Sequence, residues 1–256
     1  MTIQAPTNPM TMAGRVILVT GANQGIGRAV VDLAIALGAR VAAVDVDISG
    51  LAESDQLLPI ACDVSRAADV EASVAAALAR FGGIDGLVNN AGISRPSMAD
   101  RMTLAAWQAV IDVNLTGSFL MLQAVGARMV ADAKQGIPGE RAIVNIASDA
   151  GRRGTVGQIN YGAAKAGTIG LTMSAAREWA RYGIRVNAIS FGIVETPMTE
   201  TIREERFRDT YLQQIPLGRF APPEEVVQPV LFLLSGAASY VTGQTLSVNG
   251  GYVISA

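Results

Sequence analysis

Residues 15–37 constrain the fold more than any other part of this chain. Residues 15–20 form an apolar run that stops at a glycine-rich loop, and residues 24–37 then place apolar side chains at helical spacing. The loop reads Thr20-Gly21-Ala22-Asn23-Gln24-Gly25-Ile26-Gly27. A buried strand, a tight glycine turn and a helix in this order begin a βαβ unit.

Glycines in such a loop let the backbone turn tightly and approach a pyrophosphate. The following helix adds free N–H donors and the positive end of its dipole. The loop therefore predicts a phosphate site formed by Gly21, Asn23, Gln24, Gly25, Ile26 and Gly27. An ordinary glycine-rich turn is the alternative, and the placement of the loop between strand and helix argues against it.

The rest of the chain repeats the alternation of short apolar runs and helical patterns. We expect strands at 41–45, 58–62, 85–89, 142–147, 185–190 and 245–248, and helices at 66–81, 103–133, 158–182 and 223–235. Strands alternating with helices of this length indicate right-handed βαβ units and a parallel sheet. The predicted fold is α/β, a single-domain Rossmann-type doubly wound parallel sheet of about seven strands with helices on both faces.

The bulk properties limit the partners of the chain. Residues 1–13 lack the basic start and apolar core of a signal peptide, and we expect a disordered lead-in there, followed by one dinucleotide-binding and catalytic domain at 14–256. No run reaches the ~20 apolar residues of a membrane span. The net charge of -2 without a basic run disfavours nucleic acid. We therefore expect a cytoplasmic protein with neither membrane nor nucleic-acid partners.

Composition also excludes several kinds of catalytic site. The chain has no His and a single Cys, Cys62. This rules out Ser-His-Asp and Cys-His sites, His-ligated zinc, Cys-cluster metal sites and intrachain disulfides. We therefore predict no metal, and acid–base chemistry must use another side chain.

Asp45 bears on the identity of the nucleotide. It ends the second predicted strand, 24 residues after Gly21, where a carboxylate can accept hydrogen bonds from an adenosine ribose. The same charge would repel a 2′-phosphate, and Arg40, at the start of that strand, is poorly placed to offset it. We predict NAD(H) rather than NADP(H). The alternative is that Asp45 caps a surface turn.

Tyr161 and Lys165 are four residues apart on a predicted helix and therefore share one face. A free Tyr has a pKa of ~10, and a cation within ~4–6 Å lowers it. Lys165 is one of only two Lys in the chain, among 20 cationic residues. The use of Lys at this position predicts that Tyr161 is a general acid or base and that Lys165 lowers its pKa. The alternative is that Tyr161 and Lys165 are two solvent-exposed residues on the same helix face.

Together these motifs resemble the short-chain dehydrogenase/reductase family. The resemblance rests on the glycine loop, Asn89-Asn90-Ala91-Gly92, Ser148, and Tyr161-Gly162-Ala163-Ala164-Lys165, and it continues through 192–198, 240–243 and 249–251. Ser148 precedes Tyr161 by 13 residues, a spacing similar to that of the family. The ordered set covers essentially all the chain from Arg15 onward.

The resemblance implies a role for each matched residue. Tyr161 would be the general acid or base, Lys165 would also bind the nicotinamide ribose, and Ser148 would orient the substrate oxygen. Asn114 would hold a water in a proton relay, although from its helix position alone we would expect a surface polar residue. Further cofactor contacts would come from Asp63 and Val64 at the adenine, Asn90 and Ala91 beside the adenosine ribose, and Val194 and Thr196 at the carboxamide.

Two departures from the family pattern affect the cofactor region. Phe191 replaces the usual Pro after the sixth strand, which restores a backbone N–H and adds a ring near the expected nicotinamide face. The connection at 46–58 is short, so we expect a turn near 47–50 in place of a helix, and a more open adenine pocket.

These observations lead to an NAD(H)-dependent enzyme that interconverts a secondary alcohol and a ketone. A 3-oxoacyl-thioester reductase is the alternative within the family; it normally uses NADPH, and Asp45 argues against it. A non-catalytic nucleotide sensor or scaffold is a more distant alternative, which the intact Ser148, Tyr161 and Lys165 disfavour.

The sequence leaves the substrate itself open. The expected pocket walls are 94–98, 149–157 and 199–215, the last resembling a mobile lid, with Met98, Met198 and Phe191 as apolar lining. Arg152 and Arg153 either bind an anionic substrate or face water. By family resemblance, helices 103–133 and 158–182 would pack against their copies in a homotetramer, and the 50% hydrophobic content fits an oligomer.

Overall fold

The structure is a computed structural model and describes residues 8–254. One parallel sheet organises it, with the strand order β3-β2-β1-β4-β5-β6-β7. The strands are β1 (Val16–Thr20), β2 (Arg40–Asp45), β3 (Leu57–Ala61), β4 (Gly86–Asn89), β5 (Arg141–Ser148), β6 (Ile184–Phe191) and β7 (Thr245–Val248). The predicted doubly wound α/β sheet is confirmed.

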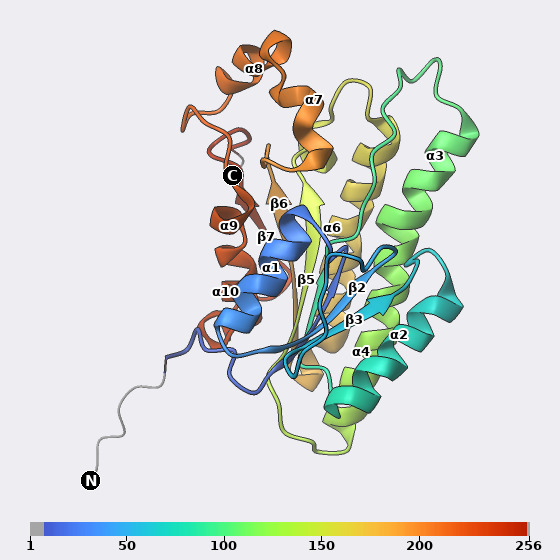
Figure 1. The fold of residues 1–256 in the computed structure, drawn as a ribbon, viewed down its shortest axis with the longest axis vertical. Coiled ribbons are helices and arrows are strands. Elements are labelled where there is room, and N and C mark those ends of the chain that lie inside the picture. The colour runs from blue at the N-terminus through green and yellow to red at the C-terminus, as the bar shows by residue number, and fades with distance from the viewer. Residues whose placement is uncertain (1–7, 255–256) are drawn as a thin grey trace.

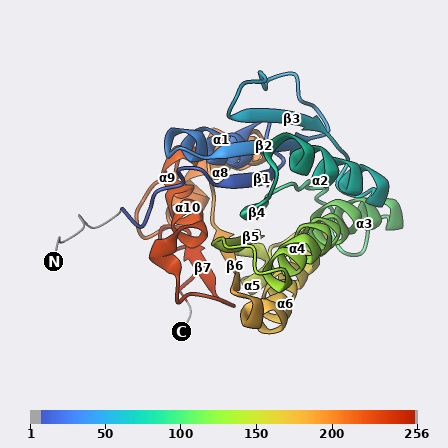
Figure 2. The ribbon, with the colours of Figure 1, turned by 90° about the horizontal axis from the view of Figure 1, so that it is seen from below.

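Helices cover both faces of this sheet (Figures 1 and 2). The longer ones are α1 (Gly25–Ala36), α2 (Ala67–Phe81), α3 (Leu104–Ile111), α4 (Ser118–Lys134) and α6 (Ile159–Trp179). Shorter ones are α5 (Ala150–Arg153), α7 (Glu200–Arg203), α8 (Glu205–Leu212), α9 (Pro223–Val226) and α10 (Gln228–Leu234). In the view along the sheet, α1, α9 and α10 lie on one side and α2, α4 and α6 on the other (Figure 2).

The two layers of helices explain why the strands are apolar without interruption. Successive residues of β1 enter different cores: Ile17 and Val19 pack with the α1 and α10 side, and Val16 and Leu18 with the α2 and α4 side. All five β1 residues are buried. Alternating side chains of a strand point to opposite faces, so a sheet covered twice requires apolar residues throughout.

Several predicted helices are interrupted. The helix expected at 103–133 contains a π-helical segment, Asp112–Gly117, between α3 and α4. The helix expected at 223–235 divides at Val227 into α9 and α10. A proline in the first turn of α10, Pro229, explains this break, because proline has no N–H for the preceding turn. The connection at 46–58 contains no helix, as predicted.

Part of the predicted disordered lead-in is ordered. Residues 1–7 lie outside the described residues, but in 8–13 the side chain of Met12 is fully buried. The backbone N–H of Met12 donates to Leu37 O, and Pro9 O accepts from the N–H of Ala237. The expectation was wrong for 8–13, because Met12 fills the apolar core beside α1.

The α3–α4 region, Leu104–Lys134, is long and apolar enough to cross a membrane by length and composition alone. Its α4 portion packs on the sheet, with Met121, Val125 and Met129 fully buried beside β4 and β5. A core helix of the domain accounts for this apolar character.

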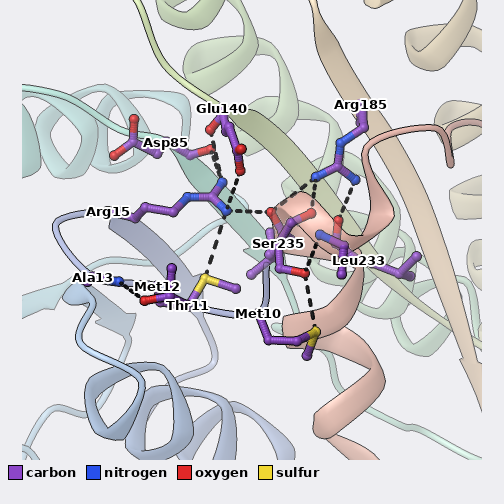
Figure 3. Close-up of polar contacts among 12 residues, drawn as sticks. Met10, Thr11, Met12, Ala13, Arg15, Asp85, Glu140, Arg185, Leu233 and Ser235 are labelled. Atoms are coloured by element: carbon purple, nitrogen blue, oxygen red, sulfur yellow. Dashed lines mark hydrogen bonds and ion pairs between the residues drawn. The ribbon is translucent and has the colours of Figure 1, made fainter. Parts of the chain in front are cut away.

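The edge of the sheet that carries the amino ends of the strands holds two arginines (Figure 3). Arg15 Nη1 donates to Leu234 O at 2.6 Å, and Arg185 donates to Leu233 O at 2.6 Å and to Ser235 O at 2.9 Å. The last carbonyls of a helix have no partner within the helix. The two guanidinium groups therefore cap the carboxyl end of α10.

Candidate active site

The opposite edge, where the strands end, contains a cavity of about 370 Å³. It lies where the order of the sheet reverses between β1 and β4, the position at which doubly wound sheets bind ligands. Its lining residues are Gly21, Gln24, Gly25, Ile26, Val44, Asp45, Val46, Cys62, Asp63, Val64, Asn90, Ala91, Gly92, Ile93, Val113, Ile146, Tyr161, Lys165, Thr196, Pro197 and Met198. Most of the predicted cofactor residues thus meet in one cavity.

The glycine loop has the geometry that close ligand approach requires. Gly21 and Gly25 have φ values of 64° and 55°, which side chains rarely adopt. A Cβ on Gly27 would overlap Gly21 O, so this position holds the helix against the loop. The α1 amino terminus has no acidic residue in its first turn and no side-chain cap. Its N–H groups are therefore available to an anion, as a bound pyrophosphate would need.

Asp45 is held at the end of β2 by two backbone groups. Its Oδ2 accepts from Asn23 N at 2.9 Å and its Oδ1 from Asp47 N at 3.3 Å. Arg40 lies at the start of β2, with its guanidinium 5.5 Å from the centre of the Phe81 ring. No cation from that strand therefore neutralises the carboxylate, which fits a ribose diol better than a 2′-phosphate.

Thr20, which we did not predict as a site residue, joins two strand ends. Its buried hydroxyl oxygen accepts from the N–H groups of Asn90 and Ala91, both at 3.0 Å. Asn90 Nδ2 returns hydrogen bonds to Thr20 O and Gly21 O. These contacts fix the segment after β4 against the glycine loop. The clue in the sequence was a hydroxyl residue at the end of an otherwise apolar strand.

The remaining predicted cofactor residues divide into two groups. Val64 and Thr196 line the cavity, and so does Asp63, whose carboxylate accepts from the N–H and hydroxyl of Ser65. The Val194 side chain lies in the apolar core and faces a different cavity. The backbone carbonyl of Val194 accepts a hydrogen bond from the Thr199 hydroxyl at 2.5 Å.

Ser148 and Tyr161 form a hydroxyl pair. Ser148 ends β5, and its Oγ accepts from the N–H of Ala150 at 3.2 Å, which leaves the hydroxyl proton free to donate. Burial raises the pKa of Tyr161, and a hydrogen bond with Ser148 opposes this by lowering it. The predicted lowering of this pKa by Lys165 is not among its causes, and desolvation of the phenol is the largest of them.

Lys165 lies one helical turn from Tyr161, as predicted, but bonds elsewhere. Its Nζ donates to Ile146 O at 2.7 Å and lies 5.6 Å from the centre of the Tyr161 ring. The side chain is 3% exposed, and burial lowers its pKa to about 8. An ammonium group has three donors, so this cation keeps hydrogen-bonding capacity for a ligand.

Asn114 was expected on a helix surface from the sequence alone, but it is fully buried. It lies in the π-helical segment, and its side-chain amide both accepts from and donates to the backbone of Ile93, at 2.8 and 3.0 Å. A π-helical turn displaces backbone carbonyls from their usual partners and often occurs at functional sites. The segment thus clamps the loop after β4 beside the cavity.

Asn160 is a buried residue of the site that we did not predict. Its Nδ2 donates to Arg95 O at 3.0 Å and to Ala106 O at 3.2 Å, and its Oδ1 accepts from the N–H of Tyr161. A bridge between Ser97 and Gln158 reinforces this connection. The predicted pocket wall at 94–98 is therefore attached to the start of α6, immediately before Tyr161.

Phe191 does not line the cofactor cavity. It extends β6 by pairing with Ser148 and Val248, and its side chain is 4% exposed in the core beside Val194. The predicted ring near the nicotinamide face is wrong, because Phe191 is the last residue of β6 and its ring points to the same core face as Ile189, two residues earlier.

Known proteins resemble this chain over almost its whole length. The family described as Enoyl-(Acyl carrier protein) reductase matches residues 21–253. A 3-oxoacyl-(acyl-carrier-protein) reductase of Thermotoga maritima is 44% identical, over 96% of this chain and 100% of that protein. A D-threitol dehydrogenase of Mycolicibacterium smegmatis is 41% identical, over 94% of each chain.

A solved structure agrees with these relatives. The 3-ketoacyl-(acyl-carrier-protein) reductase from Brucella melitensis, complexed with NADH, superimposes with a TM-score of 0.88 and 35% identity, over 95% of this chain and 100% of that one. Fold, site and similarity agree, and this chain belongs to the short-chain dehydrogenase/reductase family and is an oxidoreductase that binds a nicotinamide cofactor.

Proposed function

We propose that this protein reduces a 3-oxoacyl thioester to the 3-hydroxyacyl thioester with NADH. The observation that carries the proposal is the Ser148–Tyr161 hydroxyl pair, because Tyr161 lines the same cavity as Lys165 and Asp45. The names of the Thermotoga maritima and Brucella melitensis relatives favour this substrate class over other ketones.

Asp45 does not weigh against this substrate class. From the sequence we set the carboxylate against thioester reduction, because that activity normally goes with NADPH. The Brucella melitensis ketoacyl reductase is a structure with NADH, so the activity and the unphosphorylated cofactor are compatible in a relative. NAD(H) therefore stays the proposed cofactor.

The cofactor, when bound, would supply the hydride for the carbonyl carbon. Ser148 donates its hydroxyl proton in a hydrogen bond to the carbonyl oxygen, because the hydrogen bond that its Oγ accepts from the N–H of Ala150 leaves this proton available. Tyr161 then transfers its phenolic proton to that oxygen as general acid. The raised pKa of Tyr161 keeps this proton in place until transfer.

Two further residues complete the proton path. Lys165 binds the nicotinamide ribose with its unused donors and stabilises the phenolate left on Tyr161. Asn114, in the π-helical segment, holds a water that returns a proton through Lys165. One proton thus enters from solvent for each carbonyl reduced.

Oxidation of a small secondary alcohol, such as a polyol, with NAD is a second candidate. The D-threitol dehydrogenase of Mycolicibacterium smegmatis favours it at 41% identity, and the same residues would act in reverse. Tyr161 would then accept the hydroxyl proton as general base.

A substrate panel separates the two candidates. Purified protein is assayed by NADH absorbance with acetoacetyl-CoA in one direction and with polyols and NAD in the other. We expect kcat/KM for acetoacetyl-CoA to exceed that for any polyol by at least about tenfold, a difference of 1.4 kcal/mol. A polyol with the higher value would support the second candidate.

Two variants test the residues. Tyr161→Phe should lower kcat by ~10²–10⁴-fold while NADH binding persists, because only the transferable proton is lost. Asp45→Ala should narrow the preference for NADH over NADPH. Retained turnover in the first variant, or equal use of both cofactors by the parent protein, would contradict these assignments.

We also propose a cytoplasmic homotetramer. Exposed apolar side chains on the helices predicted to meet support it, namely Leu104, Phe119, Ile159 and Met173, which are 77%, 40%, 51% and 49% exposed. Analytical ultracentrifugation at low protein concentration tests the assembly, and a monomer would contradict it.

A further inference from the structure

A buried carboxylate lies immediately after Ser148 and has no part in the proton path. Asp149 is 2% exposed, and both of its carboxylate oxygens are used. Oδ1 accepts from the Ser190 hydroxyl at 2.9 Å, and Oδ2 accepts from Asn249 Nδ2 at 2.7 Å. Asp149 therefore joins the ends of β5 and β6 to the turn that follows β7.

Asn249 in turn organises the C-terminal turn, defined here as residues 249–253. Its Nδ2 also donates to Val253 O, and its Oδ1 accepts from the N–H of Gly251, both at 3.0 Å. Arg153 adds a second attachment, with its guanidinium 3.9 Å from the centre of the Tyr252 ring and a hydrogen bond to the Tyr252 hydroxyl. The turn is thus fixed to α5 and β5 by directional contacts.

The C-terminal turn touches the base of the predicted lid. Gly250 O accepts from the N–H of Leu217 at 3.1 Å. A Cβ on Gly250 would lie 2.9 Å from Ile215 Cγ2, and one on Gly251 would lie 2.8 Å from Pro216 Cγ. The segment that carries α7 and α8 beyond the strand ends therefore rests on this turn (Figure 1).

We propose that Asp149 is a positioning residue that fixes the C-terminal turn, and through it the lid base at 212–218, for substrate binding. The Asp149 side chain is buried and is not among the residues that line the cofactor cavity. Its backbone N–H donates to Phe191 O, so the strand end beside Ser148 stays in place without the carboxylate. The effect of the side chain therefore falls on substrate binding more than on the chemical step.

A carboxylate suits this position better than an apolar residue. Burial raises the pKa of Asp149, while its hydrogen bonds to Ser190 and Asn249 and the charges of Arg152 and Arg153 lower it. Two donors from separate segments converge on it, and directional bonds specify one arrangement where apolar packing would allow several. Apolar replacement would leave the buried donors of Ser190 and Asn249 without this acceptor.

The first test is hydrogen exchange of Asp149→Ala, which needs no substrate. We expect faster exchange in peptides covering 212–218 and 249–254, with no change in β1 to β4. Asp132→Ala is the matched control, because Asp132 is also a buried carboxylate but pairs with Arg128 on α4. Unchanged exchange in 212–218, or the same pattern in the control, would overturn the proposal.

The second test is kinetic and rests on the proposed function. With acetoacetyl-CoA and NADH, Asp149→Ala should raise KM about tenfold and leave kcat within about threefold, as expected for loss of one buried hydrogen-bond system. The Kd of NADH should not change. A fall in kcat at constant KM would overturn the positioning role, whereas inactivity of the parent protein would overturn only the proposed substrate.

A rescue variant distinguishes positioning from general damage. Asp149→Asn combined with Asn249→Asp exchanges donor and acceptor across the 2.7 Å hydrogen bond. Compared with Asp149→Asn alone, this double variant should show slower hydrogen exchange in 212–218 and a lower KM, closer to the parent value. Additive effects of the two substitutions would contradict the proposed contact.

Discussion

Two cationic sites lie at opposite edges of the sheet, and their hydrogen bonds differ: the arginines of one are half-buried, and the lysine of the other is buried. At the amino edge, Arg15 and Arg185 each donate to three backbone carbonyl oxygens (Figure 3). At the carboxyl edge, Lys165 donates to one, Ile146 O. A cation bound to several carbonyl oxygens holds backbone segments together, whereas a cation bound to one carbonyl oxygen can also bind a ligand.

The chemistry of the two side chains matches this difference. A guanidinium stays protonated in proteins and presents a rigid fork of donors, which suits the capping of a helix end. An ammonium shifts its pKa readily when buried, and that of Lys165 falls to about 8. The chain uses Arg at the structural edge and one of its two Lys at the reactive edge.

The largest expected effect is a loss of activity on substitution of the cation at the carboxyl edge. Lys165→Met should lower kcat at least ~100-fold, because it removes the group that we propose to stabilise the Tyr161 phenolate and to hold the ribose. Lys134→Met is the control, since Lys134 lies at the end of α4 over the Tyr182 ring. Steady-state NADH turnover measures kcat of both variants. If Lys165→Met kept more than one-tenth of the parent kcat, the cation at the carboxyl edge would not be needed for activity.

The converse substitution should affect stability alone. Arg185→Met leaves Leu233 O and Ser235 O without this donor, although Arg15 still donates to Leu234 O, and we expect a loss of ~2–4 kcal/mol in the free energy of unfolding. Below the unfolding transition, kcat should stay within about twofold of the parent value. Urea titration measures the loss, with exposed Arg177→Met as the comparison. If Arg185→Met were as stable as the parent but had a reduced kcat, the amino edge would serve activity and not stability, which would contradict the comparison.

Lys165 should also destabilise the fold in a pH-dependent way. Its pKa is lowered from 10.5 to about 8, so between these values the unfolded chain binds more protons and stability from this group rises with pH. Lys165→Met should therefore be more stable than the parent, by ~1–3 kcal/mol below pH 8, with the gain shrinking toward pH 10.5.

The difference between the two proteins isolates this contribution. Tyr161 and Cys62 have raised pKa values and act in the opposite direction at high pH, but they are present in both proteins. Thermal unfolding across this range provides the measurement. A stability difference that is constant with pH would show that Lys165 titrates normally in the folded state.

The smallest effect concerns the ion pair at the amino edge. Arg15 Nη1 lies 3.7 Å from a carboxylate oxygen of Glu140, whose side chain is 64% exposed. Exposed pairs contribute ~0–1 kcal/mol, so Glu140→Gln should change stability by about 0.5 kcal/mol. If Glu140→Gln lost as much unfolding free energy as Arg185→Met, the Arg15–Glu140 ion pair, and not the hydrogen bonds to carbonyl oxygens, would be the main stabilising contact at this edge.

The sequence predicted the sheet well because its signal is periodic. A strand buried on both faces needs an unbroken apolar run, and each of the seven strands, including Val16–Thr20 in β1, has a counterpart in the prediction. The clustering of Gly21, Asp45, Tyr161 and Lys165 also followed, since parallel strands and their helices bring these positions to one edge.

The predictions that were wrong or missing concern properties that depend on three-dimensional environment. Hydrophobic periodicity does not distinguish i→i+4 from i→i+5 bonding, so the π-helical segment and the burial of Asn114 were not predicted. The pKa direction of Tyr161 was wrong because desolvation depends on neighbours that spacing does not reveal. Asp149 and Asn249 are 100 residues apart, and neither residue alone indicates their contact.

The Ser148–Tyr161 pair has a consequence for how the molecule folds. The two residues are 13 apart and belong to one continuous unit, from β5 through α5 to α6. Closing so short a loop costs little chain entropy, whereas the nucleotide cavity draws on segments from Gly21 to Met198. Contacts between near neighbours form faster than distant ones. The hydroxyls of Ser148 and Tyr161 should therefore meet early in folding, before the segments of the nucleotide cavity come together.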